Sequence, residues 1–277
     1  MPVVLRLRQV TTIPLEVDAV RVEVVRGQSP AQIAATPVQY GNQPVPLAEF
    51  FDVSGSAADD QEIVWDGDCS HVKRIATGLT AGRVRVEGSA GMHLGAEMRG
   101  GTVTVSGNAG DWAGAEMHGG RIHVHGNTGH FAGAVYRGGR VGMTGGELFI
   151  DGNSGDELGH TMRRGLIAVR GTTGNAAGFN MRAGTLLLFG AVGVRPGAGM
   201  KRGTIALLGD APPPALLPTF RPACTWRPDF LRMYLNHLRQ GGFAVQDAEL
   251  AAACQRFSGD VLELGKGEIL IREAGAA

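Results

Sequence analysis

The sequence contains little cysteine, carries no net charge and has no long apolar run. Its three cysteines, Cys69, Cys224 and Cys254, lie far apart and form no CxxC pair. We therefore expect free thiols in a reducing compartment rather than a disulfide or zinc framework. With 26 basic and 26 acidic residues, the chain lacks the basic excess of most nucleic-acid and membrane-surface binders. No apolar run approaches the roughly 18–20 residues of a membrane-spanning helix. The opening residues show no signal-peptide pattern, so we expect a cytoplasmic protein.

Glycine, in contrast, is abundant, with 44 residues that gather in the middle of the chain. Seven of them lead short β-branched runs: Gly82, Gly101, Gly120, Gly146, Gly165, Gly184 and Gly203. Their spacing is 19 residues, except for 26 between Gly120 and Gly146, where residues 140–146 are interpreted as an insertion. The second and fourth positions after each leading glycine are apolar, as in Ile122 and Val124. This alternation predicts one short strand in every repeat, with one face buried.

The length of the repeat predicts how successive copies fold. A 19-residue coil must turn several corners, and glycine allows the positive φ or close backbone approach that a corner needs. One coil cannot bury its apolar face, whereas coils stacked about 4.8 Å apart can. The predicted fold class is therefore all-β: a right-handed parallel β-helix over residues 61–210, with an N-terminal cap at 1–60 and a C-terminal segment at 211–277. Asparagines at one coil position predict a side-chain ladder: Asn108, Asn127 and Asn153.

The later coils carry apolar residues on their outer strand face as well, and an apolar outer face must be covered. These residues are Leu166, Ala168, Leu187, Phe189, Ala206 and Leu208. We expect the C-terminal segment to provide the cover, because residues 228–242 form an amphipathic helical pattern with Asp229 as the N-cap. Its apolar stripe contains Leu231, Tyr234, Leu235 and Leu238.

Two positions near the end of each coil predict further columns. The sixteenth position after the leading glycine is expected to line the core: Met98, Met117, Tyr136, Met162, Met181 and Met200. The next position is expected to point outward and is basic in every coil: Arg99, His118, Arg137, Arg163, Arg182 and Lys201. This basic column has two interpretations. It is either a solvated stripe that aids solubility, or a track that binds a polyanion or an acidic partner.

Candidate residues for catalysis or metal binding are scarce. His123 and His125 share one strand face, a spacing that metal sites sometimes use, and His118 and His130 lie nearby in the sequence. No cysteine or carboxylate repeats beside them, which favours an exposed strand, so we predict no metal ligand. The sequence has no P-loop, nucleophile elbow or HExxH motif, and no catalytic residue is predicted.

Four stretches of the sequence carry a family resemblance. They are the coil G-x-V-x-V-x-G-N-x-G-x-x-x-G-A-x-M-x-G, the opening TIPLEVDAV, the later PVPLAEFFDVSG, and RFSGDVLELGKGEILI at 256–271. Together they resemble the C subunit of formylmethanofuran dehydrogenase, above all its bacterial version in the formyltransferase/hydrolase complex. The resemblance covers essentially the whole chain. The C-terminal domain of glutamate synthase has similar coils, but the flanking stretches favour the C subunit.

The resemblance implies a structural subunit with no catalytic residue of its own, in a complex that handles one-carbon units on methanofuran and tetrahydromethanopterin during formaldehyde oxidation. The implied partners are an amidohydrolase-like hydrolase subunit, a formyltransferase subunit and a dehydrogenase-like B subunit, with neither nucleic acid nor membrane. No cofactor is expected on the chain itself. A methanofuran-type carrier has a glutamate-rich tail that the basic column could contact. The alternatives are the C subunit of a formylmethanofuran dehydrogenase and a free-standing carbohydrate-binding β-helix.

Overall fold

The computed structural model describes residues 1–9 and 11–273. Position 10 of the predicted cap and positions 274–277 of the predicted C-terminal segment lie outside the described residues. Most of the regular structure is β: a 13-stranded sheet and a 4-stranded sheet, with a few short helices. Within the described residues, no helix has the length and apolar character needed to cross a membrane. The predicted all-β class is confirmed at this level.

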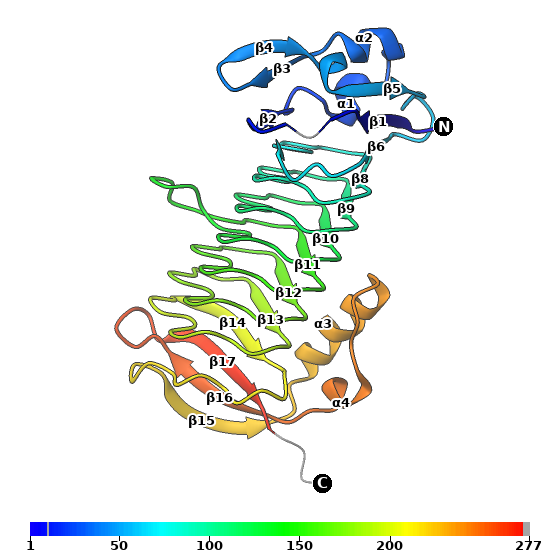
Figure 1. Ribbon diagram of the computed structural model, residues 1–277. Helices are drawn as coiled ribbons and strands as arrows, with labels where there is room; N and C mark the ends of the chain where they lie inside the picture. The colour runs from blue at the N-terminus through cyan, green and yellow to red at the C-terminus, as the bar shows by residue number, and fades with distance from the viewer. Residues whose placement is uncertain (10, 274–277) are drawn as a thin grey trace.

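The larger sheet runs the length of the molecule (Figure 1). Its central strands pair in parallel, in the order in which they occur along the chain. They are β1 (Val3–Leu7), β6 (Glu62–Asp66), β8 (Arg83–Val86), β9 (Thr102–Val105), β10 (Arg121–Val124), β11 (Glu147–Ile150), β12 (Leu166–Val169), β13 (Thr185–Leu188), β14 (Arg202–Leu207) and β17 (Lys266–Arg272). Antiparallel strands close both ends: β5 (Phe51–Ser54) pairs with β1, while β16 (Cys254–Gly259) and β15 (Arg221–Trp226) follow β17.

The pairing register follows the repeat that the leading glycines define. Ile122 of β10 lies opposite Val103 of β9 and Leu148 of β11, the equivalent residues of the coils before and after it. Ile122 and Val124 are fully buried, as the alternation predicts. A second column of parallel bridges joins the same coils at another corner: Cys69, Ala90, Ala109, Thr128, Ser154, Thr173 and Val192. Each coil is therefore held to its neighbours at two places.

The glycines and asparagines explain why the coils stack closely. Gly120 has a φ of +82°, which residues with a Cβ rarely adopt. Gly126 is needed for space, since a Cβ there would lie 2.5 Å from Asn108 Oδ1. The backbone N–H of Asn127 donates to Asn108 Oδ1 at 2.8 Å, and that of Asn153 donates to Asn127 Oδ1 at 2.8 Å. The predicted asparagine ladder is thus confirmed as side-chain bonds to the next coil's backbone.

The insertion in the third coil lies earlier than the sequence predicts. The N–H of Thr144 donates to the carbonyl of Met117, and that of Arg163 donates to the carbonyl of Met143. Met143 is fully buried between these coils, so it occupies the core position assigned to Tyr136. The extra residues are therefore 136–142, not 140–146. They form the green loop that projects from the stack on the side away from the helices in Figure 1.

The N-terminal residues add a small sheet above the first coil (Figure 1). Its strands are β4 (Gln43–Pro46), β3 (Pro37–Tyr40), β2 (Leu15–Glu16) and β7 (Val72–Lys73), in that order. Three short helices accompany it: α1 (Val22–Val25), α2 (Pro30–Ala34) and the 3-10 helix η1 (Leu47–Glu49). Ser29 caps α2 by accepting a hydrogen bond from Gln32 N. Their buried side chains belong to the same apolar cluster that fills the coil interior.

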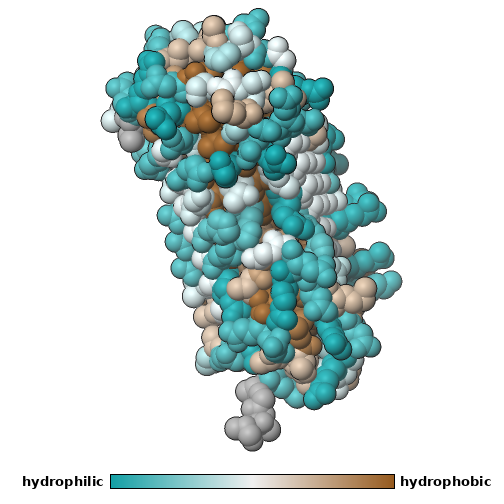
Figure 2. All heavy atoms as spheres, turned by 90° about the vertical axis from the view of Figure 1, so that its right-hand side faces the viewer, coloured by the Kyte–Doolittle hydropathy of each residue, from teal (hydrophilic) through white to brown (hydrophobic). Residues whose placement is uncertain are grey.

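A second apolar cluster lies outside the coils, on the strand face that needs a cover. Helix α3 (Asp229–Gln240) buries Leu231, Leu235 and Leu238 against this face, and the short helix α4 (Asp247–Leu250) follows it. The predicted helix is confirmed, but Pro228 rather than Asp229 is its N-cap residue. Tyr234 stays 37% exposed. Figure 2 shows this side of the molecule, where apolar atoms appear between hydrophilic ones.

Candidate functional site

The basic column is present on the surface, with one residue out of place. Backbone hydrogen bonds connect its position from coil to coil: Arg99, His118, Thr144, Arg163, Arg182 and Lys201. Thr144 stands where Arg137 was expected, because the insertion displaces Arg137. Within the described residues, Arg99, Arg163 and Arg182 are exposed and form no ion pair, whereas Lys201 pairs with Glu263 at 3.2 Å. His118 Nδ1 lies 2.6 Å from the Thr144 hydroxyl.

Arg137 is nevertheless brought back beside the later column residues. The insertion forms one wall of a groove of about 630 Å³, and Arg137, Arg182 and Lys201 all line it. Arg140 adds a further cation, while Glu157 and Glu263 are carboxylates in the same lining. Arg99, His118 and Arg163 do not line the groove. Half of the six predicted residues therefore meet at a single concave surface.

The floor of this groove is aromatic, a feature that the sequence analysis missed. Trp112 and Phe131 line it and stack with ring centroids 4.8 Å apart, and His93 stacks on the other face of Trp112 at 5.6 Å. His93, Trp112 and Phe131 each occupy the eleventh position after a leading glycine. Their φ values are positive: 64°, 59° and 61°, respectively. Their 19-residue spacing could have revealed this aromatic stack from the sequence. Left-handed backbone costs a residue with a Cβ roughly 1–2 kcal/mol, so the stack offsets a real strain.

Tyr136 joins the insertion to this aromatic floor. Its hydroxyl contacts His93 Nδ1, and its backbone N–H donates to Glu116 Oε1 at 3.1 Å. Burial raises the pKa of Tyr136 to about 12. Burial, with added repulsion from Arg74 and Lys73, lowers the pKa of His93. Both side chains are thus held neutral near pH 7.

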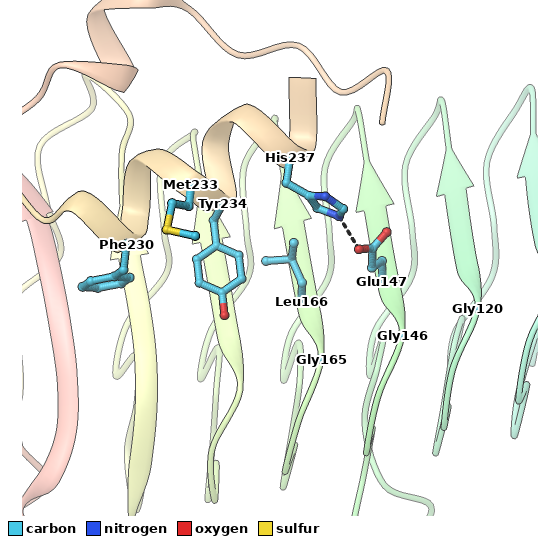
Figure 3. A pocket seen from close by; sticks show the side chains of 9 residues that line it. All are labelled: Gly120, Gly146, Glu147, Gly165, Leu166, Phe230, Met233, Tyr234 and His237. Atoms are coloured by element: carbon cyan, nitrogen blue, oxygen red, sulfur yellow. Dashed lines mark hydrogen bonds and ion pairs between the residues drawn. The ribbon is translucent and has the colours of Figure 1, made fainter. Parts of the chain in front are cut away.

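A second cleft of about 750 Å³ lies on the side of the stack that α3 covers, between α3 and the N-terminal ends of the neighbouring strands. Phe230, Met233 and Tyr234 of α3 line it together with Leu166 of β12, and His237 near the end of α3 contacts Glu147 (Figure 3). Met233 is 73% exposed. The lining of the cleft is mainly apolar, and its histidine and carboxylate, His237 and Glu147, are bound to each other, so the cleft offers contact surface rather than reactive groups.

His123 on β10 and His125 just after it have a partner that the sequence analysis did not assign. Asp151, just after β11, accepts from His123 Nε2 at 3.0 Å and from His125 Nδ1 at 2.7 Å. Burial acts to raise the pKa of Asp151, but the hydrogen bonds and charges of the two histidines outweigh it, so that pKa lies below its usual range. A carboxylate therefore does stand beside these histidines.

Known proteins resemble this chain both in sequence and in structure. A family model described as GXGXG motif matches residues 70–212. The C subunit of tungsten-containing formylmethanofuran dehydrogenase 2 from Methanothermobacter marburgensis is 38% identical over 97 residues, which are 34% of this chain and 36% of that protein. The C subunit of molybdenum-containing formylmethanofuran dehydrogenase 1 from Methanosarcina barkeri is 37% identical over 95 residues, covering 33% and 32%. The match thus spans about a third of these curated relatives.

A solved structure matches over much more of the chain. The X-ray crystal structure of the formyltransferase/hydrolase complex (FhcABCD) from Methylorubrum extorquens, in complex with methylofuran, contains a chain that superposes with a TM-score of 0.89. The two are 33% identical, and the superposition covers 98% of this chain and 100% of that one. The shared fold therefore includes the flanking segments as well as the coils.

Proposed function

This chain belongs to the GXGXG motif family, and we propose that it is the C subunit of a formyltransferase/hydrolase complex, in which it has a structural role. Superposition over the full length of a chain from such a complex carries the proposal, because accidental similarity of coils would leave the flanking segments unmatched. The resemblance seen in the sequence is confirmed by relatives named as C subunits of formylmethanofuran dehydrogenases. The chemistry would then belong to an amidohydrolase-like subunit, a formyltransferase subunit and a dehydrogenase-like B subunit.

We propose that the chain serves methanofuran-linked one-carbon metabolism in the cytoplasm, as a right-handed parallel β-helix (61–210) between a cap (1–60) and a covering segment (211–277). Parallel pairing at two corners of every coil supports the helix. The thiols of Cys69, Cys224 and Cys254 are free, which suits a reducing compartment.

The metals named in the relatives are not assigned to the two buried cysteines of this chain, Cys69 and Cys254. Thiolate, not thiol, is the form that binds metal. Burial raises the pKa of Cys69 to about 12 and that of Cys254 to about 11. Both side chains stay protonated near neutral pH, so they do not fit a tungsten or molybdenum site.

The groove is the surface on which we propose that the carrier's acidic tail is guided. Arg137, Arg140 and Arg182 line it and form no ion pair within the described part of the chain, so they are available to carboxylates. The stacked rings of Trp112 and Phe131 give the same groove an apolar floor. Arg99 and Arg163 extend the basic column beyond it.

The experiment is a native purification of the tagged chain from its own cells, with co-purifying proteins identified by mass spectrometry. Stoichiometric recovery of an amidohydrolase-like subunit and a formyltransferase supports the proposal. Recovery of a tungsten or molybdenum dehydrogenase without a formyltransferase would instead identify the chain as the C subunit of a formylmethanofuran dehydrogenase. Recovery of the folded chain alone would reject both complexes and favour a free-standing carbohydrate-binding β-helix.

A further inference from the structure

Two imidazoles and one carboxylate converge on the outer face of the coil stack, away from the groove. His123 lies on β10 and His125 follows directly after its last residue, so the two, spaced two residues apart, share one face. Asp151 stands next to His125 in the following coil, because its backbone N–H donates to the carbonyl of Val124. The possible ligand atoms of the three side chains all lie within 4.8 Å of one another.

The surrounding structure holds these groups in place. His123 is only 8% exposed and meets the edge of the Phe149 ring at 80°, with the centroids 5.7 Å apart. Phe149 in turn packs against Phe243 beneath the C-terminal cover. Val124 pairs with Ile150 in the parallel register of β10 and β11, which sets His125 and Asp151, the residues that follow them, side by side. The geometry exists before any ligand arrives, which lowers the cost of binding.

Neighbouring charges leave the carboxylate to the two histidines. In the next coil, the position that corresponds to Asp151 is occupied by Arg170, which is bound to Glu249 at 2.7 Å. On the other side, Arg121 is bound to Glu147 at 2.6 Å. Within the described residues, Asp151 pairs with neither lysine nor arginine.

We propose that His123, His125 and Asp151 form a binding site for a divalent transition-metal ion, with zinc as the natural probe. Two imidazole nitrogens and one carboxylate oxygen suit zinc and its neighbours better than magnesium or calcium, which prefer oxygen. Tetrahedral zinc with bonds of about 2.0–2.1 Å separates its ligand atoms by about 3.3 Å. The two nitrogen–oxygen separations, 3.0 and 2.7 Å, would need to open by about 0.3–0.6 Å to reach this value. The two imidazole nitrogens lie within 4.8 Å of each other.

Solvent reaches the site, so an ion can enter and water can complete its coordination. The side chains of His125 and Asp151 are 46% and 31% exposed. A bound ion would link β10 to β11 at the edge of the surface that α3 covers. Such an ion binds the folded chain and not the unfolded one, so it would raise the thermal midpoint.

The test is isothermal titration calorimetry of the full chain with zinc chloride, after treatment with a chelator. A Cys224→Ser background is used, because an exposed thiol such as that of Cys224 can itself bind zinc. We expect one equivalent to bind, with affinity about tenfold or more lower in His125→Ala and in Asp151→Asn. His130→Ala is the matched control. Its imidazole faces a single carboxylate, that of Asp156, at 3.7 Å, so its loss should leave zinc affinity unchanged.

Binding that Asp151→Asn leaves intact, or no binding at one equivalent, overturns the proposal. X-ray absorption at the zinc edge gives a reading that needs no ligand variant to fold. Nitrogen and oxygen neighbours at about 2.0–2.1 Å support the site, whereas sulfur at about 2.3 Å would move the ion to a cysteine and refute it.

Discussion

The Tyr136 hydroxyl lies 3.1 Å from His93 Nδ1, although 43 residues separate the two in the sequence. Tyr136 is the first residue of the insertion 136–142, and His93 is the first ring of the aromatic stack that continues through Trp112. This contact therefore joins the wall of the groove to the aromatic stack that forms its floor. Both partners are uncharged near pH 7. Because burial disfavours the charged form of His93, the stability of this region should depend on pH in the acid range.

Acid is expected to weaken the fold through His93. Its lowered pKa means that the folded chain holds a neutral imidazole, so the unfolded chain takes up the proton first as pH falls. Stability is then lost from the ordinary histidine pKa of about 6.5 downward to the lowered folded value. His93→Asn tolerates the left-handed backbone but cannot titrate. Between about pH 7.5 and pH 5, its thermal midpoint should fall less steeply than that of the wild type.

Tyr136→Phe is the control for this prediction. It removes the hydroxyl partner but leaves His93 buried, and burial is the largest cause of the lowered pKa. The acid slope of Tyr136→Phe should therefore match that of the wild type. If His93→Asn has the wild-type slope as well, His93 does not contribute to acid sensitivity.

Ala176→Gly should stabilise the folded chain, although replacing alanine with glycine usually destabilises a protein. The φ of +57° at Ala176 costs a residue with a Cβ roughly 1–2 kcal/mol, whereas glycine's extra chain entropy costs roughly 0.5–1 kcal/mol. The net gain should be about 0.5 kcal/mol in urea unfolding. Exposed Ala191 does not have positive φ, so Ala191→Gly should lose about 0.5–1 kcal/mol. Equal losses at both sites would show that the left-handed backbone stores no strain.

The strands and the core were predictable because a repeated pattern reports directly on them. Alternating apolar residues such as Ile122 and Val124 give the buried face, and the leading glycines give the register. The position of the insertion was not predictable. Tyr136 and Met143 are both acceptable core residues, and Gly139 kept a false 19-residue register. Only packing shows that Met143 fills the core and that Tyr136 leaves it.

The same insertion hid part of the surface chemistry. His125 and Asp151 each stand five positions after a leading glycine, so the glycine alignment does place them in adjacent coils. Asp151 was overlooked because only a carboxylate that repeats from coil to coil was considered. Arg137 was assigned to the column through that alignment, yet it reaches the groove by way of the loop. The stack that includes Trp112 and Phe131 could have been found, since its members recur one coil apart. It was missed because each coil carries a different residue type at that position.

The cover provided by α3 should be a major source of stability. Leu235 is 1% exposed within the cluster that contains Phe149 and Leu187. Leu235→Ala should lower the free energy of unfolding by about 2–5 kcal/mol and increase binding of a hydrophobic dye. Met233→Ala, on the exposed side of the same helix, should change it by less than about 0.5 kcal/mol. Urea titration compares the two, and equal effects would show that α3 is not seated through Leu235.

Affinity for an acidic tail should depend on the groove rather than on the column alone. Arg137→Glu and Arg182→Glu each reverse a charge that lines the groove, and each should weaken binding of an oligoglutamate peptide about fivefold, the equivalent of about 1 kcal/mol for one exposed pair. Arg232→Glu makes the same change on exposed α3 and should have little effect. Arg99→Glu decides between the two surfaces, because Arg99 belongs to the column but lies outside the groove. Fluorescence anisotropy at low salt measures all four variants. A loss at Arg99 as large as that at Arg182 would extend the binding surface along the whole column, and unchanged affinity at Arg137 and Arg182 would remove the groove from consideration.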